Sequence, residues 1–231
     1  MNPKLSIVIP TVHEKIDSSL IRMAKTYPRS PLIEYLIIDQ GTSEAFFHQL
    51  NRSDFRIFSG PSRSRAQKLQ EGLELALGSI LIFHHPRSVI DADGLQWILD
   101  HNNEITWGAF THSFDEDHWG LNFTSFYSNF IRPALSQIFY LDHCLFFKRD
   151  FLDQEIPDIP IFEDTEICKI LRRHGKPKLL PYISVTSAIR FKTNGFAKQA
   201  WLNQKMKLAY YLGLSKNKMN RIYEKNLNLN G

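Results

Sequence analysis

The sequence has few cysteines and no long apolar run. Only two cysteines, Cys144 and Cys168, occur among its 231 residues, and two isolated thiols are too few for a disulfide framework or a zinc site. No stretch reaches the roughly 18 unbroken apolar residues that a membrane-spanning helix requires. The short apolar run near the start also lacks the small-residue cleavage site of a secretory signal. We therefore expect a protein of the reducing cytoplasm.

Linker sequences are also scarce. The first 190 residues contain no stretch rich in Gly, Ser or Pro that would separate two domains. Hydrophobic residues make up 43% of the chain and charged residues 23%, which excludes a chain disordered by composition. The sequence predicts one globular domain over residues 1–190 and a C-terminal appendage over residues 191–231.

Basic charge is concentrated in that appendage. Residues 190–231 carry nine lysines and arginines against Glu224 alone, a net charge of +8. Since the whole chain has a net charge of +4, the remainder is close to −4. The apolar residues of the appendage recur at helical spacing, which predicts two basic amphipathic helices interrupted at Gly213.

Apolar runs alternate with amphipathic stretches along most of the chain. Buried strands are predicted at residues 5–11, 34–41, 55–60, 79–85, 107–114, 143–150 and 176–188. Helices are predicted at residues 13–27, 64–78, 91–103 and 163–175, with Gly78 ending the second. Residues 115–135 fit neither pattern. This order predicts an α/β fold with a mostly parallel sheet and helices on both faces, whose ligands bind beyond the carboxyl ends of the strands.

Six segments, taken in order, resemble one family. They are LSIVIPTVHE, EYLIIDQGTSE, SRSRAQKLQEGLELALGSILIFHH, WGAFTHSF, YLDHCLFFKRDFLD and PIFEDTEICKILRRHGK. Together they resemble the small bacterial subgroup of family 2 glycosyltransferases of the GT-A type, over about residues 4–225. The resemblance implies transfer of a sugar, with inversion, from a UDP- or GDP-linked donor to a saccharide or lipid-linked acceptor.

The same resemblance assigns candidate site residues. Donor contacts are expected from Pro10, Thr11, Glu14, Asp39, Arg63, Arg65, His85 and Arg87. Asp39 would accept hydrogen bonds from the nucleotide, although an Asp before Gly41 also suits a turn. The arginines would bind phosphate beside a helix start, or else lie as charges on the helix surface.

Catalysis and acceptor binding are assigned further along the chain. Asp164, supported by Glu163, would be the general base, since an inverting transfer needs a carboxylate to take the acceptor proton. Acidic residues also simply favour a helix start, which is the alternative for both. Asp142 and His143 replace part of a Gly-Asp-Gln motif and are expected on the acceptor side, or as turn residues.

The expected metal motif is altered. The family has a carboxylate after the fourth strand that binds Mg²⁺ or Mn²⁺, and His85, Pro86 and Arg87 align with it. Divalent ions prefer oxygen ligands, and a fixed cation repels them. A positioned arginine could neutralise the leaving diphosphate instead. Asp91 and Asp93 are better explained as acids at a helix start. We therefore expect a metal-independent transferase, or alternatively a degenerate nucleotide-binding or interaction module.

The basic appendage allows two interpretations, a membrane-binding segment or a structural one, and a third, nucleic-acid binding, is not expected. Lysines interspersed with Trp201, Tyr210 and Tyr211 are typical of a segment at an anionic membrane surface. Equally, its apolar side could close the domain core while its lysines face water. No base-reading motif accompanies the charge, so nucleic acid is not expected.

Overall fold

The computed structural model describes residues 2–15, 18–61 and 64–225. Arg63, predicted to bind phosphate, lies outside these ranges. An eight-stranded sheet runs through the described chain in the order β3-β2-β1-β4-β7-β6-β8-β5. Its strands are β1 (Leu5–Pro10), β2 (Ile33–Asp39), β3 (Phe55–Ser59), β4 (Ile80–Phe83), β5 (Ser88–Ile90), β6 (Trp107–Phe114), β7 (Leu145–Lys148) and β8 (Lys178–Thr186).

The sheet is mixed. Strands β3, β2, β1 and β4 pair in parallel, as do β6 and β8. Strand β7 runs antiparallel to both of its neighbours, and the short β5 runs antiparallel to β8. The parallel half follows from the βαβ units predicted from the sequence. The sequence did not predict β5, which has only three residues and directly follows the His85 turn.

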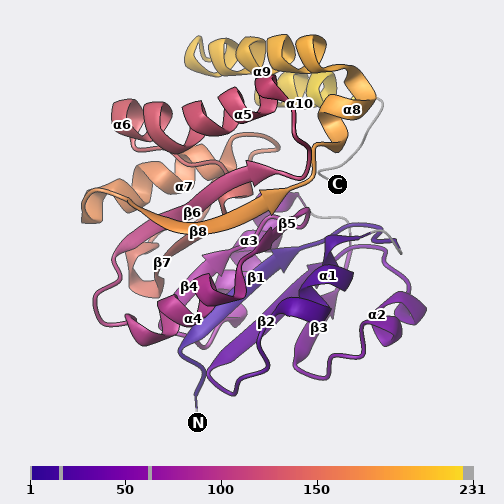
Figure 1. Ribbon diagram of the computed structural model, residues 1–231, viewed down its shortest axis with the longest axis vertical. Coiled ribbons are helices and arrows are strands. Elements are labelled where there is room, and N and C mark those ends of the chain that lie inside the picture. Colours follow the sequence, from indigo (N-terminus) through magenta and orange to yellow (C-terminus); the bar gives the residue numbers. More distant parts are fainter. Residues whose placement is uncertain (1, 16–17, 62–63, 226–231) are drawn as a thin grey trace.

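Helices cover both faces of the sheet, as predicted (Figure 1). One face packs against α1 (Ser19–Thr26), α2 (Glu44–Leu50) and α4 (Ala92–Asp100). The other packs against α3 (Arg65–Leu75) and α7 (Glu163–Leu171). Strand β1 divides its side chains by parity, so that Ile7 enters the first core and Val8 the second. Burial on both sides explains why the central strands β1, β2 and β4 are largely apolar.

Helix α3 starts and ends where local hydrogen bonds allow. Ser64 accepts a bond from the backbone of Gln67, whose side chain bonds back to Ser64, forming a capping box. The prediction that Gly78 ends this helix is wrong, because the helix stops at Leu75 with Ala76 as its C-cap. Gly78 instead lies against the start of β1, where an added Cβ would be 2.6 Å from Ser6 Oγ. The glycine allows two backbones to approach closely.

Most of residues 115–135, unassigned from the sequence, belong to a nearly continuous helical segment over residues 119–136. It comprises α5 (Trp119–Phe126), a π-helical turn η1 (Tyr127–Ile131) and α6 (Arg132–Ser136). Asn129 from the π turn bonds both the backbone N–H and the carbonyl of His112 on β6. These two bonds fix the segment to the sheet. The remaining short helical turns are η2 (Leu141–His143), η3 (Arg149–Phe151) and η4 (Arg172–His174).

The C-terminal appendage contains the two predicted helices on either side of Gly213, α9 (Phe196–Tyr211) and α10 (Lys216–Tyr223). A short helix that the sequence did not predict, α8 (Ile189–Asn194), precedes them. Figure 1 shows α9 and α10 beyond α5 and α6, at the end of the molecule away from the N-terminus. Met206 and Met219 pack with Ile161 in a small separate core. Trp201, Leu208 and Tyr211 of α9 are exposed, so the appendage does not simply close the main core. None of the described helices has both the length and the apolar character needed to cross a bilayer.

Candidate active site

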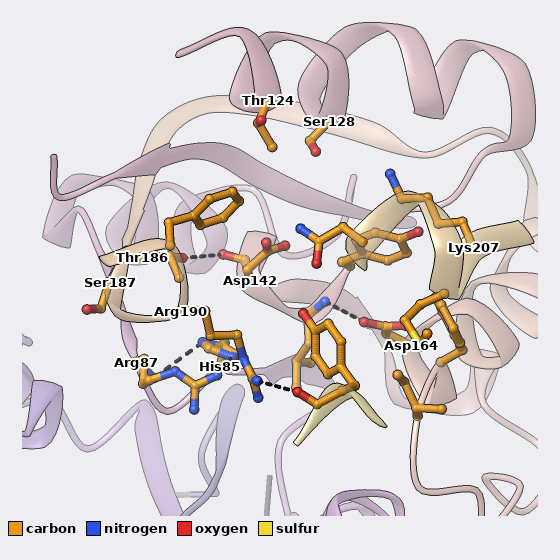
Figure 2. Close-up of a pocket in the computed structure, with 18 of the residues that line it drawn as sticks. His85, Arg87, Thr124, Ser128, Asp142, Asp164, Thr186, Ser187, Arg190 and Lys207 are labelled. Atoms are coloured by element: carbon orange, nitrogen blue, oxygen red, sulfur yellow. Dashed lines mark hydrogen bonds between the residues drawn. The ribbon is translucent and has the colours of Figure 1, made fainter. Parts of the chain in front are cut away.

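A cavity of about 180 Å³, open to solvent, lies between the sheet and the helical segments (Figure 2). Its floor is formed near the ends of β4, β8 and the η2 turn, by His85, Thr186 and Asp142. Thr124 and Ser128 line it from the α5–α6 segment, and Asn203, Met206, Lys207 and Tyr223 line it from the appendage. The two predicted parts of the chain therefore meet in this cavity. Its concave lining of apolar side chains with a few polar and charged groups is typical of a small-molecule site.

One side of the cavity gathers three guanidinium groups: Arg87 follows β4, Arg65 opens α3 and Arg190 opens α8. Burial, together with the positive charges of Arg190 and Arg65, lowers the pKa of Arg87 to about 10. The crowding of like charges costs free energy unless an anion lies among them. Because Arg65 pairs with Glu163 and Arg190 pairs with Glu224, this side of the cavity keeps a smaller net positive charge, which suits an anionic ligand.

His85 belongs to the same side but carries no charge at neutral pH. Burial and the nearby Arg87 lower its pKa well below the ordinary value. Its Nε2 is 3.2 Å from Nη2 of Arg87, so the neutral ring can accept a hydrogen bond from the guanidinium. Its neighbour His84 is enclosed in the core, with Nε2 2.6 Å from the Tyr27 hydroxyl. His85 therefore orients Arg87, whereas His84 supports the fold.

Arg190 is held by the last helix. Its Nη2 is 2.5 Å from Oε1 of Glu224, and its guanidinium lies 4.5 Å from the Tyr223 ring centroid. The Arg190 side chain also donates to the Tyr223 carbonyl over 3.4 Å. In the sequence alone, Arg190 is only one of the nine basic residues of 190–231. A polar residue shortly after the last strand of an α/β sheet was the available signal.

Asp164 lines the opposite side of the cavity. It lies in the first turn of α7, where one carboxylate oxygen accepts a bond of 3.0 Å from the backbone of Leu141 and the other accepts from Thr165 N at 2.7 Å. Burial and the adjacent Glu163 raise the pKa of Asp164 to about 7. A carboxyl group with a pKa near neutrality is suited to accept and release a proton.

Glu163 does not line the cavity. It is buried behind Asp164 and pairs through Oε1 with Nε of Arg65. Burial of Arg65 disfavours its positive charge, but the ion pair with Glu163 outweighs this and raises the pKa of Arg65. Glu163 thus links Arg65, on the arginine side of the cavity, to the neighbouring Asp164. Glu163 can therefore affect Asp164 in two ways: it positions Arg65, and its negative charge lies beside the Asp164 carboxyl group. Its predicted supporting role stays a prediction.

Asp142 faces the cavity from η2, and its backbone is fixed. Its carbonyl accepts bonds from Ser88, Ser184 and Thr186, at 3.2, 2.8 and 3.2 Å. Its carboxylate Oδ2 is 3.6 Å from Nε2 of His112, a buried histidine that sequence reasoning missed. An isolated histidine inside a strand gives no signal until the fold places it beneath another residue.

The charge of Asp142 depends on its neighbours. Burial would raise its pKa, but His112, His143 and Arg132 together hold the pKa of Asp142 below its ordinary value. Burial lowers the pKa of His112, and it lowers the pKa of His143 to about 3. Since both rings are neutral near pH 7, the permanent charges that stabilise the carboxylate there are the guanidiniums of Arg132 and Arg65, and the histidines add to this only when protonated. Asp142 is an ionised hydrogen-bond acceptor at the cavity wall.

His143 does not reach the cavity. Its ring is fully buried, 3.1 Å from Nη2 of Arg132 on one side and 3.1 Å from the Phe110 carbonyl on the other. The predicted contact between His143 and an acceptor therefore has no direct geometric support. Its place in the structure is beneath Asp142, where it positions Arg132.

The other predicted donor residues lie at the carboxyl edge of β1 and β2, outside the residues that line the cavity. Pro10 ends β1, and Thr11 donates to Oδ1 of Asp39 over 2.8 Å. Thr42 bonds both oxygens of Asp39, and its hydroxyl accepts from the backbone of Glu14 at 2.9 Å. Asp39 is thus buried in a network that shapes this edge.

Glu14 lies between that edge and the cavity cations. Burial raises its pKa, while the charge of Arg87 opposes the rise and that of Asp39 adds to it. The backbone edge of β1 is further fixed by Lys68, whose ammonium donates to the Thr11 carbonyl over 2.9 Å. Role assignments for Pro10, Thr11, Glu14 and Asp39 toward a nucleotide stay predictions.

The cavity does not fit a divalent metal ion. Where the resembling family has a carboxylate, this chain has Arg87, and Arg65 and Arg190 lie on the same side. Among residues 2–15, 18–61 and 64–225 there is no group of three or more His, Cys, Asp or Glu side chains able to hold a metal. Three fixed cations in place of oxygen ligands repel Mg²⁺ or Mn²⁺.

Comparison with solved structures identifies the architecture. TarS from S. aureus, residues 1–349, superposes with a TM-score of 0.62 at 13% identity, covering 97% of this chain and 71% of TarS. TarS in complex with UDP-GlcNAc gives a TM-score of 0.59 at 12% identity, over 80% of this chain and 58% of the other. The chain has a GT-A type fold.

A mycobacterial protein is similar to this chain in fold, with a lower TM-score than TarS. It superposes with a TM-score of 0.54 and 15% identity, over 80% of this chain and 65% of its own length. No protein-family model matches the sequence, and no curated protein matches it either. The GT-A likeness is therefore one of fold, and the chemistry has to be argued from the cavity.

Proposed function

We propose that the protein is a glycosyltransferase that moves a sugar from a nucleoside-diphosphate sugar to an acceptor hydroxyl, with inversion and without a divalent metal ion. The observation that carries this proposal is the pairing, across one cavity, of three guanidiniums with a carboxyl group of raised pKa. The first set suits a diphosphate and the second suits an acceptor proton. TarS, which has the same fold, binds UDP-GlcNAc, which favours a UDP-linked donor.

The proposed reaction uses each side of the cavity once. The acceptor oxygen attacks the anomeric carbon while Asp164 takes the hydroxyl proton. The bond between the anomeric carbon and the diphosphate oxygen breaks, and that oxygen keeps the electron pair. Arg87, Arg65 and Arg190 neutralise the charge that develops on the departing diphosphate. Attack opposite the leaving group inverts the configuration of the sugar.

Asp142 is placed for a different task. It is ionised, its backbone is fixed by three hydroxyls, and its pKa is too low for it to collect a proton near pH 7. An ionised carboxylate accepts hydrogen bonds from sugar hydroxyls. We assign Asp142 to positioning a sugar and Asp164 to proton transfer, following the rule that neighbouring carboxyls with separated pKa values take separate roles.

The acceptor is proposed to be a saccharide or lipid-linked hydroxyl, and the protein is proposed to act in the cytoplasm. The helical segments supply neutral polar groups, Thr124, Ser128 and Asn203, to the cavity wall. Hydroxyl and amide groups of this kind recognise hydroxyl-rich ligands by hydrogen bonding.

A donor panel tests the proposal. The purified protein is incubated with UDP- and GDP-sugars in the presence of Mn²⁺ or of EDTA, and thermal stability and released nucleotide are both followed. We expect stabilisation and slow nucleotide release with one donor, equal in both conditions. Diphosphate binding that collapses in EDTA contradicts the metal-independent mechanism. Stabilisation with no release, even with candidate acceptors present, indicates a nucleotide-binding module instead.

A further inference from the structure

The α5–α6 segment has its polarity reversed. Its outward positions hold large apolar side chains, with Trp119 and Leu135 each 80% exposed and Phe123 62% exposed. Two more aromatics, Phe126 and Phe130, are also exposed on the segment. A helix that is covered only by water normally shows its polar residues outward. The exposed face of residues 119–135 is therefore matched to something other than water.

The inward positions of the same segment confirm the reversal. They are occupied largely by polar side chains, with Ser125, Ser128, Asn129 and Arg132 all buried. Ser125 approaches His112, and Asn129 bonds the β6 backbone. These residues line the cavity or bond to the sheet. The segment therefore cannot rotate to bury its aromatic side chains without breaking those hydrogen bonds. The apolar face is thus a fixed outer surface.

Helix α9 presents a second outward stripe beside it. Lys198, Trp201, Lys205, Leu208 and Leu212 are all exposed and follow one another at intervals of three and four residues. The Lys205 ammonium lies 5.2 Å from the Trp201 ring centroid. The two helical segments meet where the ammonium of Lys207 lies 5.2 Å from the Tyr127 ring centroid. We call these two stripes together the aromatic–basic face.

Charge selects the occupant of this face. Residues 119–136 contain one charged residue, Arg132, and α9 contains three lysines and no acid. A second copy of the chain would oppose lysine with lysine, which is unfavourable. A bilayer with anionic headgroups accepts both components, because aromatic and leucine side chains enter the interface while lysines stay at the headgroups.

We propose that the aromatic–basic face docks on the surface of an anionic lipid bilayer and so presents the cavity to an acceptor anchored in that bilayer. The second half rests on the proposed glycosyl transfer. Thr124, Ser128, Asn203 and Lys207, which line the cavity, belong to the same helical segments as the face. Docking these helices therefore brings the neutral polar wall of the cavity close to the headgroups. The acceptor class is then lipid-linked rather than a free saccharide.

Vesicle co-sedimentation of the full chain tests docking directly. Vesicles of phosphatidylcholine alone are compared with vesicles of equal parts phosphatidylcholine and phosphatidylglycerol, at low and high salt. We expect binding to the mixed vesicles, weakened by salt, and little binding to phosphatidylcholine. Equal indifference to both vesicle types at low salt overturns the proposal.

Substitutions separate this face from general stickiness. Phe123→Ser with Phe130→Ser should weaken binding to mixed vesicles by roughly tenfold or more, since apolar burial drives insertion. Lys198→Glu with Lys205→Glu should remove the preference for phosphatidylglycerol. The control is Leu77→Ser, which removes a side chain that is 58% exposed and follows α3. If the control variant loses binding as strongly as the phenylalanine pair, the face is not the docking surface.

Two further measurements keep docking apart from catalysis and from self-association. UDP binding, followed by thermal shift, should be the same in the wild type and in all of these variants, because none of the substituted residues lines the cavity. Loss of UDP binding in the wild type would undermine the proposed function but not the vesicle result. Sedimentation velocity without lipid should show a monomer, and a dimer abolished by Phe123→Ser with Phe130→Ser would overturn docking in favour of a second copy.

Discussion

The carboxyl edge of β1 and β2 and the helical layer formed by residues 119–136 with α9 are built on opposite principles. At the strand edge, apolar residues are inside and the few buried polar groups, such as Asp39 and Lys68, have specific partners. In the helical layer, polar residues such as Ser128 and Asn129 are inside and aromatics are outside. The strand edge is arranged for stability. The helical layer lines the cavity, and in our proposal its outer side contacts a lipid bilayer.

The two regions contribute different kinds of residue to the cavity. Residues attached to the sheet or packed directly on it, such as Arg87 and Asp164, carry the proposed chemistry. Residues of the helical layer, such as Ser128 and Asn203, supply neutral contacts to whatever enters from that side. Catalytic groups need a rigid support, whereas acceptor contacts tolerate more variation.

The largest expected effect comes from the base on the sheet side. Asp164→Asn keeps the shape of the side chain but removes proton acceptance, so turnover should fall by about 10² or more while UDP affinity persists. Asn203→Ala in the helical layer should instead raise KM for the acceptor and leave kcat within a few fold. Steady-state kinetics with both variants checks the division, and near-normal turnover of Asp164→Asn would exclude its role as base.

A smaller effect is expected from the cation that replaces the metal ligand. Arg87→Ala should weaken UDP binding by about 10- to 100-fold, the range of a charge-assisted contact to phosphate. Arg173→Ala, on an exposed turn after α7, is the matched control and should leave binding unchanged.

Arg87→Asp tests whether the arginine replaces a metal ion at this site. The substitution places a carboxylate at the family's metal position and removes one of the three crowded cations, so nucleotide binding should become responsive to Mn²⁺. Isothermal titration with and without Mn²⁺ measures both changes. A wild-type protein that already requires Mn²⁺ would refute the metal-independent site.

The sequence predicted the strand edge and helix α9 well but not residues 119–136, for a physical reason. Continuous apolar runs such as residues 35–38 indicate strands buried on both faces, and the helix start at Glu163 lies in one of the segments that resemble a known family. The helical segment over residues 119–135 could not be predicted in this way, because its large apolar side chains point outward and a π turn interrupts the helical period. Arg190 and His112 were missed because their partners, Glu224 and Asp142, are distant in sequence.

Packing should differ between the two regions as well. An alanine Cβ at Gly72 in α3 would be 2.1 Å from Val8 Cγ1 on β1, whereas at Gly120 in α5 the nearest atom would be 3.3 Å away on His118. Gly72→Ala should therefore lower the free energy of unfolding by about 1–3 kcal/mol through overpacking. Gly120→Ala should leave it unchanged or raise it by up to about 1 kcal/mol through helix propensity.

Denaturant unfolding of both glycine variants measures this contrast. The two substitutions are chemically identical and both lie in helices, so any difference between them reports the surroundings rather than the residue. Equal destabilisation by Gly72→Ala and Gly120→Ala would mean that the helical layer is packed as tightly as the strand edge.

The smallest effect concerns the pH at which the base becomes active. Burial and the charge of Glu163 raise the pKa of Asp164, and a base must be deprotonated to work. Activity should therefore fall as pH drops through that raised pKa, at a higher pH than an ordinary aspartate would give. Glu163→Gln removes the neighbouring negative charge and releases the charge of Arg65 from its ion pair.

Both consequences of Glu163→Gln favour the ionised form of Asp164. The acid limb of kcat should therefore move to lower pH, by less than about one unit, while the alkaline limb stays in place. The pH profiles of wild type and variant, recorded where thermal unfolding shows both to be folded, measure the shift. A limb that moves to higher pH would mean that Glu163 acts on Asp164 mainly by positioning Arg65, because losing that orientation would remove the cation that stabilises the carboxylate.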